Sequence, residues 1–348
     1  MVKKETTDCV SVVFEIPTNL ETAFQFKQGQ SLTMKINRDE NEVRRTYSIC
    51  SSPFDKELKV AIKKIADGKF SVFANDILKK GDTIDVMEPV GNFFTELNPS
   101  NKKNYLAFAA GSGITPVLSL IKTTLAEEKE SSFTLVFGNK SRNSIIFFEE
   151  LEGLKNKYMN RFSLVHILSR EKTDSALNFG RINVEKLNDL QKLIDYTTFD
   201  EFFICGPEEM IFATKNFLIE QGTEEKKIHF ELFNSTTTKK SDAKNKLFQK
   251  NSSAQTNITI KVDGRSFEFE QPLNSNITIL DAALKEGLDL PFACKGGMCC
   301  TCKAKLVEGL VDMDVHWGLE HSEIERGYIL TCQSHPKTEK IIVDFDIK

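Results

Sequence analysis

The spacing of the last cysteines constrains this chain more than any other feature. Cys294, Cys299, Cys302 and Cys332 follow the pattern C-x4-C-x2-C with a distant fourth cysteine, which is the ligand spacing of a plant-type [2Fe–2S] cluster. A structural zinc site is the alternative, because four thiolates also suit tetrahedral zinc. Zinc sites usually pair two C-x2-C knuckles, and the second knuckle is missing here. The pattern therefore predicts a [2Fe–2S] cluster, with Cys300 as a bystander.

The residues around these cysteines fit a metal-binding loop. Gly296 and Gly297 lie between the first two ligands, and glycine adopts positive φ without steric cost. Such freedom would allow backbone N–H groups to turn toward the cluster sulfurs. The apolar residues 328–331 precede the last ligand, as expected for a cysteine at the end of a strand.

Length and composition indicate a soluble chain of two or three domains. The 348 residues are 40% hydrophobic and 28% charged, a balance typical of globular proteins. The net charge of −4 gives no reason to expect nucleic acid or an anionic membrane as partner. No apolar run approaches the roughly 18 residues that span a bilayer, and the N-terminus lacks the apolar segment of a secretory signal. We expect a cytoplasmic protein.

The pattern of apolar and polar residues changes along the chain. In residues 1–100, short alternating apolar runs separated by turn residues predict a small antiparallel β-barrel. In residues 101–233, strands alternate with helices, which predicts an α/β domain with a parallel sheet. Residues 234–255 are rich in Lys, Ser and Thr, which predicts a flexible linker. Residues 256–348 form a third, α+β unit with a strand pair, a helix and the cysteine loop.

The barrel region carries a flavin-type motif. Arg45-Thr46-Tyr47-Ser48 resembles the R-x-Y-S motif of the ferredoxin–NADP reductase superfamily, in which the arginine pairs with the flavin diphosphate, the tyrosine packs on the flavin and the serine lies near N5. Taken alone, a four-residue match on an exposed strand is equally compatible with a structural role. Ala61-Ile62-Lys63 resembles the next flavin-contacting strand. Gly68-Lys69-Phe70-Ser71 resembles the G-x-x-S helix start, whose free N–H groups suit a diphosphate, and favours FAD over FMN.

Two further motifs indicate a nucleotide site. Gly111-Ser112-Gly113-Ile114-Thr115-Pro116 follows an apolar run and opens a helix, so that its backbone can approach a pyrophosphate. It lacks the third glycine of the general dinucleotide fingerprint but matches the superfamily's G-x-G-x-x-P turn. Cys205-Gly206-Pro207-Glu208-Glu209-Met210 resembles its C-G-P-x-x-M motif, in which the cysteine lies beside the nicotinamide. As a lone cysteine at a strand end, Cys205 would be structural.

Two further pairs of residues are predicted to contact the cofactors, one at the nucleotide and one at the flavin. Ser169-Arg170 resembles the pair that NADP-selective members place on the 2′-phosphate, a group that arginine can bind through two donors. The alternative is a surface ion pair of Arg170 with Glu171 or Asp174. In Phe230-Glu231-Leu232-Phe233, the resemblance implies that Glu231 and Phe233 lie near the flavin.

The domain order matches an electron-transfer chain. A flavin barrel, a nucleotide domain, a linker and a β-grasp ferredoxin domain together resemble the reductase components of ring-1,2-phenylacetyl-CoA epoxidases, which are multicomponent di-iron oxygenases. The stretches that carry this resemblance are residues 42–51, 294–302 and 330–336. The resemblance implies electron flow from NADPH through FAD and the [2Fe–2S] cluster to an oxygenase, with hydride transfer in a pocket edged by Ser48, Cys205 and Glu231. A reductase for another Rieske or di-iron oxygenase, and a non-catalytic iron–sulfur sensor or binding protein, stay open as alternatives.

Overall fold

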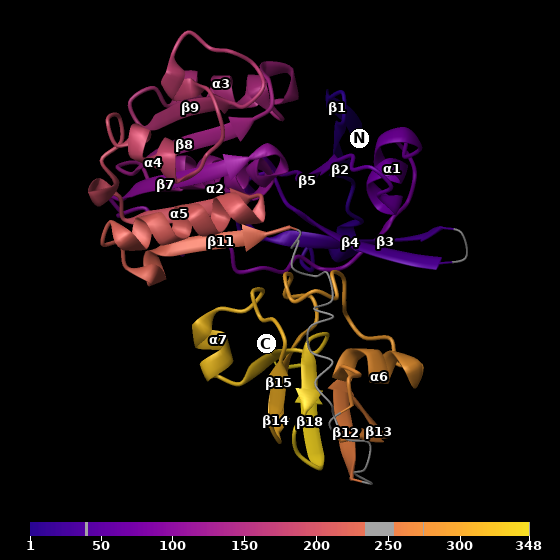
Figure 1. Cartoon of the computed structure of the whole chain (residues 1–348). Helices are drawn as coiled ribbons and strands as arrows, with labels where there is room; N and C mark the ends of the chain where they lie inside the picture. Colours follow the sequence, from indigo (N-terminus) through magenta and orange to yellow (C-terminus); the bar gives the residue numbers. More distant parts are fainter. Residues whose placement is uncertain (39–40, 234–253, 274, 348) are drawn as a thin grey trace. The chain divides into compact units, whose positions relative to one another are not determined.

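The computed structural model describes residues 1–38, 41–233, 254–273 and 275–347 (Figure 1). The chain divides into two compact units, Met1–Asn234 and Ser235–Lys348. The first unit contains both the barrel and the parallel sheet, so the boundary expected at residue 100 stays a prediction. Residues 234–253 of the expected linker lie outside the described residues.

The first part of unit one is a barrel of short antiparallel strands. Its two three-stranded sheets have the orders β1-β2-β5 and β4-β3-β6, and a bridge between Ile49 and Val60 joins them. The strands are β1 (Val2–Thr6), β2 (Cys9–Phe14), β3 (Ser31–Arg38), β4 (Asn41–Ser48), β5 (Leu58–Lys63) and β6 (Asp85–Val86). Helix α1 (Lys69–Asp76) buries Phe70 and Ala74 in the barrel core. These strands confirm the predicted barrel.

The second part of unit one is a five-stranded parallel sheet with the order β11-β10-β7-β8-β9. Its strands are β7 (Asn104–Ala110), β8 (Ser132–Asn139), β9 (Phe162–Leu168), β10 (Glu201–Gly206) and β11 (Ile228–Leu232), and its helices are α2 (Ile114–Glu127), α3 (Phe148–Lys157), α4 (Val184–Leu190) and α5 (Glu208–Glu220). The central strands read as nearly continuous apolar runs because both faces of a parallel sheet are covered. The predicted α/β domain is therefore confirmed.

Helix α2 attaches this sheet to the barrel. The Ser119 hydroxyl donates to the Ser51 carbonyl at 2.6 Å, and the Thr123 hydroxyl donates to Ser52 Oγ at 3.0 Å. Lys122 bridges Asp55 of the barrel and Glu150 of α3, at 2.6 Å from each carboxylate. Polar groups buried in this way are stabilising only when they are paired, so these contacts hold the middle of α2 against the segment that follows β4.

Unit two is a mixed sheet accompanied by two short helices. The sheet order is β13-β12-β18-β14-β16, with β12 and β18 parallel and the other pairs antiparallel. Strands β15 and β17 form a separate pair. The elements are β12 (Gln255–Val262), β13 (Arg265–Pro272), α6 (Ile279–Lys285), β14 (Lys303–Glu308), β15 (Val311–Met313), α7 (His321–Glu325), β16 (Tyr328–Leu330), β17 (Ser334–Pro336) and β18 (Lys340–Asp344). This is the β-grasp arrangement that the sequence predicts.

The core of unit two reaches the cysteine loop. The Thr278 side chain caps α6 by accepting from Asp281 N, and Ile279 and Leu280 are buried beneath it. Cys302 and Cys332 belong to the same buried cluster. The fold therefore carries two of the predicted ligands in its interior.

Within the described part of the chain, every helix is too short or too polar to cross a lipid bilayer.

Candidate flavin, nucleotide and iron–sulfur sites

The four predicted cluster ligands form two pairs. Cys294 and Cys299 approach to 3.2 Å between their Sγ atoms, and the side chains of Cys302 and Cys332 are hydrogen-bonded to each other. Cys302 and Cys332 are buried, whereas Cys294 is exposed. Across the described residues, no group of three or more His, Cys, Asp or Glu side chains is arranged to hold one metal ion. Two thiolate pairs are the donor set that a two-iron cluster needs.

Hydrogen-bond donors surround these sulfur atoms. The backbone N–H groups of Gly296 and Cys299 each lie 3.4 Å from Cys294 Sγ. Hydrogen bonds from the Cys299 side chain and from backbone donors lower the pKa of Cys294, whereas the pKa of the donating Cys299 thiol is raised. The residues therefore fit a cluster held by four thiolates, which would supply one-electron transfer when bound.

The loop backbone partly follows the prediction. Gly297 has φ 72°, and a Cβ there would lie 2.8 Å from the Val315 carbonyl oxygen, so only glycine fits. The other left-handed residue of the loop is Lys295, with φ 51°, rather than Gly296.

The predicted flavin residues on β4 lie where the barrel meets the parallel sheet. Ser48 is buried, and its hydroxyl donates to Glu231 Oε2 at 2.9 Å. The Tyr47 ring lies 5.4 Å from the Phe70 ring, and burial raises the pKa of Tyr47, so its phenol stays neutral. Arg45 is exposed and donates to the Arg44 carbonyl at 2.7 Å.

Some of the other flavin candidates, on β5 and α1, are part of the hydrophobic core of the barrel. Ile62 and Phe70 are at most 1% exposed and belong to the barrel core. The Ser71 hydroxyl accepts from Ile65 N at 3.2 Å and donates to the Gly68 carbonyl at 3.3 Å. A Cβ on Gly68 would lie 2.3 Å from Ser71 Oγ, so glycine is needed where α1 begins. Lys63 lies 3.6 Å from Asp8. Because the first N–H groups of a helix have no partner within the helix, the backbone at the start of α1 can offer them to a phosphate.

The glycine turn packs directly against the end of β10. Gly111 has φ 55°, and a Cβ on Gly113 would lie only 2.0 Å from the Cys205 carbonyl oxygen. The chain enters α2 at Ile114, and the Thr115 hydroxyl donates to the Ser112 carbonyl at 3.0 Å. Two helix N-termini, those of α2 and α5, thus follow adjacent strands at the carboxyl edge of the sheet, where such folds bind dinucleotides.

The thiol of Cys205 is fully buried. It lies beside Glu231 in the β10–β11 register, and burial raises its pKa well above the ordinary value. Pro207 and Met210 follow at the start of α5, and a Cβ on Gly206 would lie 2.6 Å from Met210 Cε. Phe233 packs against the core of the parallel-sheet domain. The Cys205 thiol therefore stays neutral and is not a nucleophile.

Ser169 and Arg170 lie at the opposite end of this edge, after β9. Ser169 donates to the Asn139 carbonyl through its N–H at 2.9 Å and through its hydroxyl at 3.3 Å. Glu171 accepts from the backbone N–H of Arg142 at 2.8 Å. In the part of the chain that the structure describes, Arg170 is exposed and forms no ion pair with Glu171 or Asp174.

The sequence reasoning missed Asn139. Its side chain is buried, and among the described residues neither amide atom has a hydrogen-bond partner. Its position as the last residue of a parallel strand, one strand away from Ser169, was the signal that could have singled it out.

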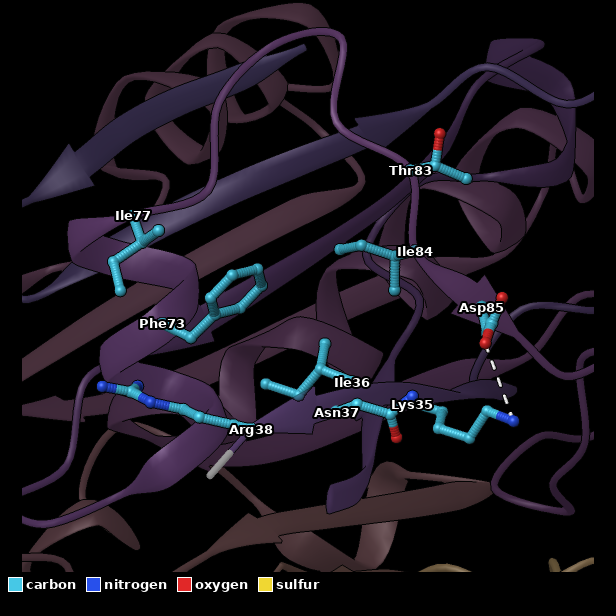
Figure 2. A pocket seen from close by; sticks show the side chains of 9 residues that line it. All are labelled: Lys35, Ile36, Asn37, Arg38, Phe73, Ile77, Thr83, Ile84 and Asp85. Atoms are coloured by element: carbon cyan, nitrogen blue, oxygen red, sulfur yellow. Dashed lines mark ion pairs between the residues drawn. The ribbon is translucent and has the colours of Figure 1, made fainter. Parts of the chain in front are cut away.

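One cavity in unit one is separate from these residues. A cavity of about 420 Å³ lies on the barrel. Figure 2 shows its lining side chains, among them Ile36, Phe73 and Ile84, and the Lys35–Asp85 ion pair at its border. None of the predicted site residues lines it.

Comparison with known proteins identifies the family. Three family models match the chain: an oxidoreductase FAD-binding domain over residues 2–95, an oxidoreductase NAD-binding domain over 108–216 and a 2Fe-2S iron-sulfur cluster binding domain over 260–337. The chain is 43% identical to one of the subunits of the 1,2-phenylacetyl-CoA epoxidase of Escherichia coli, with 100% of this chain and 96% of the relative covered. The chain belongs to the flavin- and iron–sulfur-dependent oxygenase reductases.

Other relatives agree with this assignment. The reductase is 32% identical, over 99% of its length and 95% of the relative, to the ferredoxin reductase component of the 3-ketosteroid-9-alpha-monooxygenase of Rhodococcus rhodochrous. Its fold matches phthalate dioxygenase reductase with a TM-score of 0.56 at 21% identity, covering 99% of this chain and 96% of the other. It also matches an intact type IV self-sufficient cytochrome P450 monooxygenase with a TM-score of 0.68 at 20% identity, covering 99% of this chain and 40% of the other.

These matches confirm the fold class and the cofactor classes. The reductase has FAD-binding, nicotinamide-nucleotide-binding and [2Fe–2S] domains and is an oxidoreductase. The roles of individual site residues stay predictions.

Cysteine substitutions will separate ligands from the bystander. We expect Cys294→Ser to abolish the visible absorption of the cluster, because a serine hydroxyl replaces one of four thiolates. Cys300→Ser serves as the matched control and should retain full iron and sulfide content. Equal loss of iron in both variants, measured with the flavin absorption unchanged, would contradict the assignment.

Replacing Glu231 should change how stability depends on pH. Burial raises the pKa of Glu231 to about 7, against the lowering effect of the Ser48 hydrogen bond. The unfolded chain releases this proton at lower pH, so folding loses stability as pH rises from about 5 to 7. We expect Glu231→Gln to stabilise the reductase by roughly 2–3 kcal/mol more at pH 8 than at pH 5, because each unit of the pKa difference between the folded and unfolded chain corresponds to about 1.4 kcal/mol.

Urea unfolding at the two pH values measures this difference. Glu96→Gln is the control, because Glu96 is an exposed carboxylate paired with Lys27. A stabilisation by Glu231→Gln that is equal at pH 5 and pH 8 would rule out titration as its cause.

Proposed function

We propose that this reductase supplies electrons to a 1,2-phenylacetyl-CoA epoxidase, taking them from NADPH. The observation that carries the proposal is the 43% identity to the epoxidase component along the entire chain, against 32% to the steroid monooxygenase component. A reductase for a steroid-type oxygenase is the second candidate, since those relatives also cover the whole chain. We also infer a cytoplasmic location, in which NADPH is available and cysteine thiolates stay reduced.

The chain's residues would hold the cofactors as follows. Arg45 and the backbone N–H groups after Gly68 would bind the FAD diphosphate, and Tyr47 would pack against the flavin. The turn at Gly111 and Gly113 would hold the nucleotide pyrophosphate. When bound in these residues, FAD would supply hydride acceptance and single-electron release, chemistry that belongs to the cofactor.

Ser48, Cys205 and Glu231 would position the reacting rings. The Ser48 hydroxyl and the Glu231 carboxyl are hydrogen-bonded at the junction of barrel and sheet. With a pKa of about 7, Glu231 can hold or release a proton at neutral pH beside Ser48 Oγ. The neutral, buried thiol of Cys205 would exclude water from the face on which the nicotinamide lies.

Nucleotide choice depends on Arg170 in this proposal. The exposed guanidinium and the neighbouring Ser169 hydroxyl are suited to a 2′-phosphate. We expect Arg170→Ala to lower kcat/KM for NADPH by about 10- to 100-fold, because a charge-assisted contact contributes roughly 1.5–3 kcal/mol, and to leave kcat/KM for NADH unchanged. Lys172→Ala is the control for loss of one nearby positive charge. An equal loss with both nucleotides would exclude 2′-phosphate recognition.

Reconstitution tests the oxygenase partner. The purified reductase is combined with the oxygenase component of a phenylacetyl-CoA epoxidase or, in a parallel reaction, of a 3-ketosteroid-9-alpha-monooxygenase. We expect NADPH oxidation coupled to substrate epoxidation only in the first reaction. Coupled turnover with the steroid component alone would replace the proposed partner with the second candidate, and reduction of an artificial acceptor serves as the control for an active reductase.

A further inference from the structure

The side chain of Gln333 reaches three acceptors around the cysteine loop. Its Nε2 atom lies 2.8 Å from the Cys332 carbonyl oxygen, 3.1 Å from the Lys295 carbonyl oxygen and 3.7 Å from Cys332 Sγ. One amide group thus contacts the last cluster ligand and the segment after the first ligand. Sequence reasoning assigned no role to this residue.

The chemistry of the acceptors determines the orientation of the amide. Both carbonyl oxygens, and a thiolate sulfur, accept hydrogen bonds and donate none. If the amide were turned over, its own oxygen would face these acceptors and be repelled. The N–H groups of Gln333 therefore point toward Cys332.

The backbone of Gln333 is held on both sides. Its N–H donates to the Leu330 carbonyl at 2.9 Å, and its carbonyl accepts from Asp314 N at 3.0 Å. Its Cγ lies 3.1 Å from the position that a Cβ on Gly297 would occupy. The side chain is packed against the glycine of the ligand loop, so the donor is already in place before a cluster binds.

We propose that Gln333 is a positioning residue that raises the reduction potential of the [2Fe–2S] cluster through an N–H···S hydrogen bond to Cys332. The inference rests on the proposed electron path through the cluster. Reduction adds one negative charge, which spreads onto the ligand sulfurs, and a donor to a ligand sulfur stabilises that charge. Cys332 is only 4% exposed, so the interaction is little screened by water.

The position of this donor distinguishes it from the others in the loop. Cys294 receives its hydrogen bonds from the backbone N–H groups of Gly296 and Cys299, which side-chain substitution does not remove. Gln333 contributes a side-chain donor to the buried ligand. This donor can therefore be removed by substituting residue 333, whereas the backbone donors cannot. A higher potential favours transfer of each electron from reduced FAD to the cluster.

The test is a redox titration of the full-length, cofactor-loaded protein. We expect Gln333→Leu to lower the equilibrium constant for one-electron reduction of the cluster about tenfold, which corresponds to about 59 mV for a one-electron couple. The reduced cluster is followed by its electron paramagnetic resonance signal, so the result does not depend on how many molecules contain a cluster. Gln255→Leu is the matched control, since Gln255 is exposed at the start of β12.

A second variant keeps the test decisive if Gln333→Leu binds the cluster poorly. Gln333→Met retains the length of the side chain without an N–H donor, and the same decrease is expected. An unchanged potential in both variants, with the cluster lost faster on heating, would mean that Gln333 only holds the loop through Lys295, and would overturn the proposal. NADPH-driven cluster reduction in the unsubstituted protein tests the electron path separately, so failure of that path is distinguishable from failure of the role of Gln333.

Discussion

The junction between the barrel and the parallel sheet is the contact on which the flavin and nucleotide sites depend. Ser48 and Glu231 are separated by 183 positions in the chain, yet their side chains lie 2.9 Å apart. Helix α2 reinforces the junction through buried hydrogen bonds to the residues after β4. Neither half brings these groups together alone, because the predicted flavin residues come from the barrel and the predicted nucleotide turns come from the sheet. Burial at this junction also raises the pKa of Glu231 toward neutrality, where a carboxyl can exchange a proton.

The β-grasp unit meets two different physical requirements. It has to keep the four predicted thiolate ligands together and to leave the cluster accessible for electron transfer to a partner. Cys302 and Cys332 are buried in its core, whereas Cys294 is exposed. The close approach of Gly297 to the Val315 carbonyl shows how tightly the loop is packed. Gln333 extends this arrangement, since its amide group connects the residue after Cys294 with Cys332.

Candidate site residues that share a short motif could be proposed from the sequence, whereas those brought together by strand packing could not. The cysteine spacing and the glycine turn are short-range signals, because one loop supplies most of the groups that each site needs. Ile62 and Phe70 matched the superfamily motif, but their side chains lie in the barrel core, so any contact with FAD has to come from their backbone. Asn139 carries no motif, and its unpaired amide is visible only once the strands are aligned at the sheet edge.

The sequence by itself determined the fold class, the order of the domains and the cofactor classes, because each depends on patterns within short segments, and it predicts the four cluster ligands from their spacing. The tertiary structure alone decided which distant residues meet. It brought Ser48 to Glu231, closed Gly113 against Cys205, and directed the Gln333 amide to a ligand sulfur. These contacts arise from the packing of strands and helices far apart in the chain, and a one-dimensional pattern carries no record of which buried polar groups will face each other.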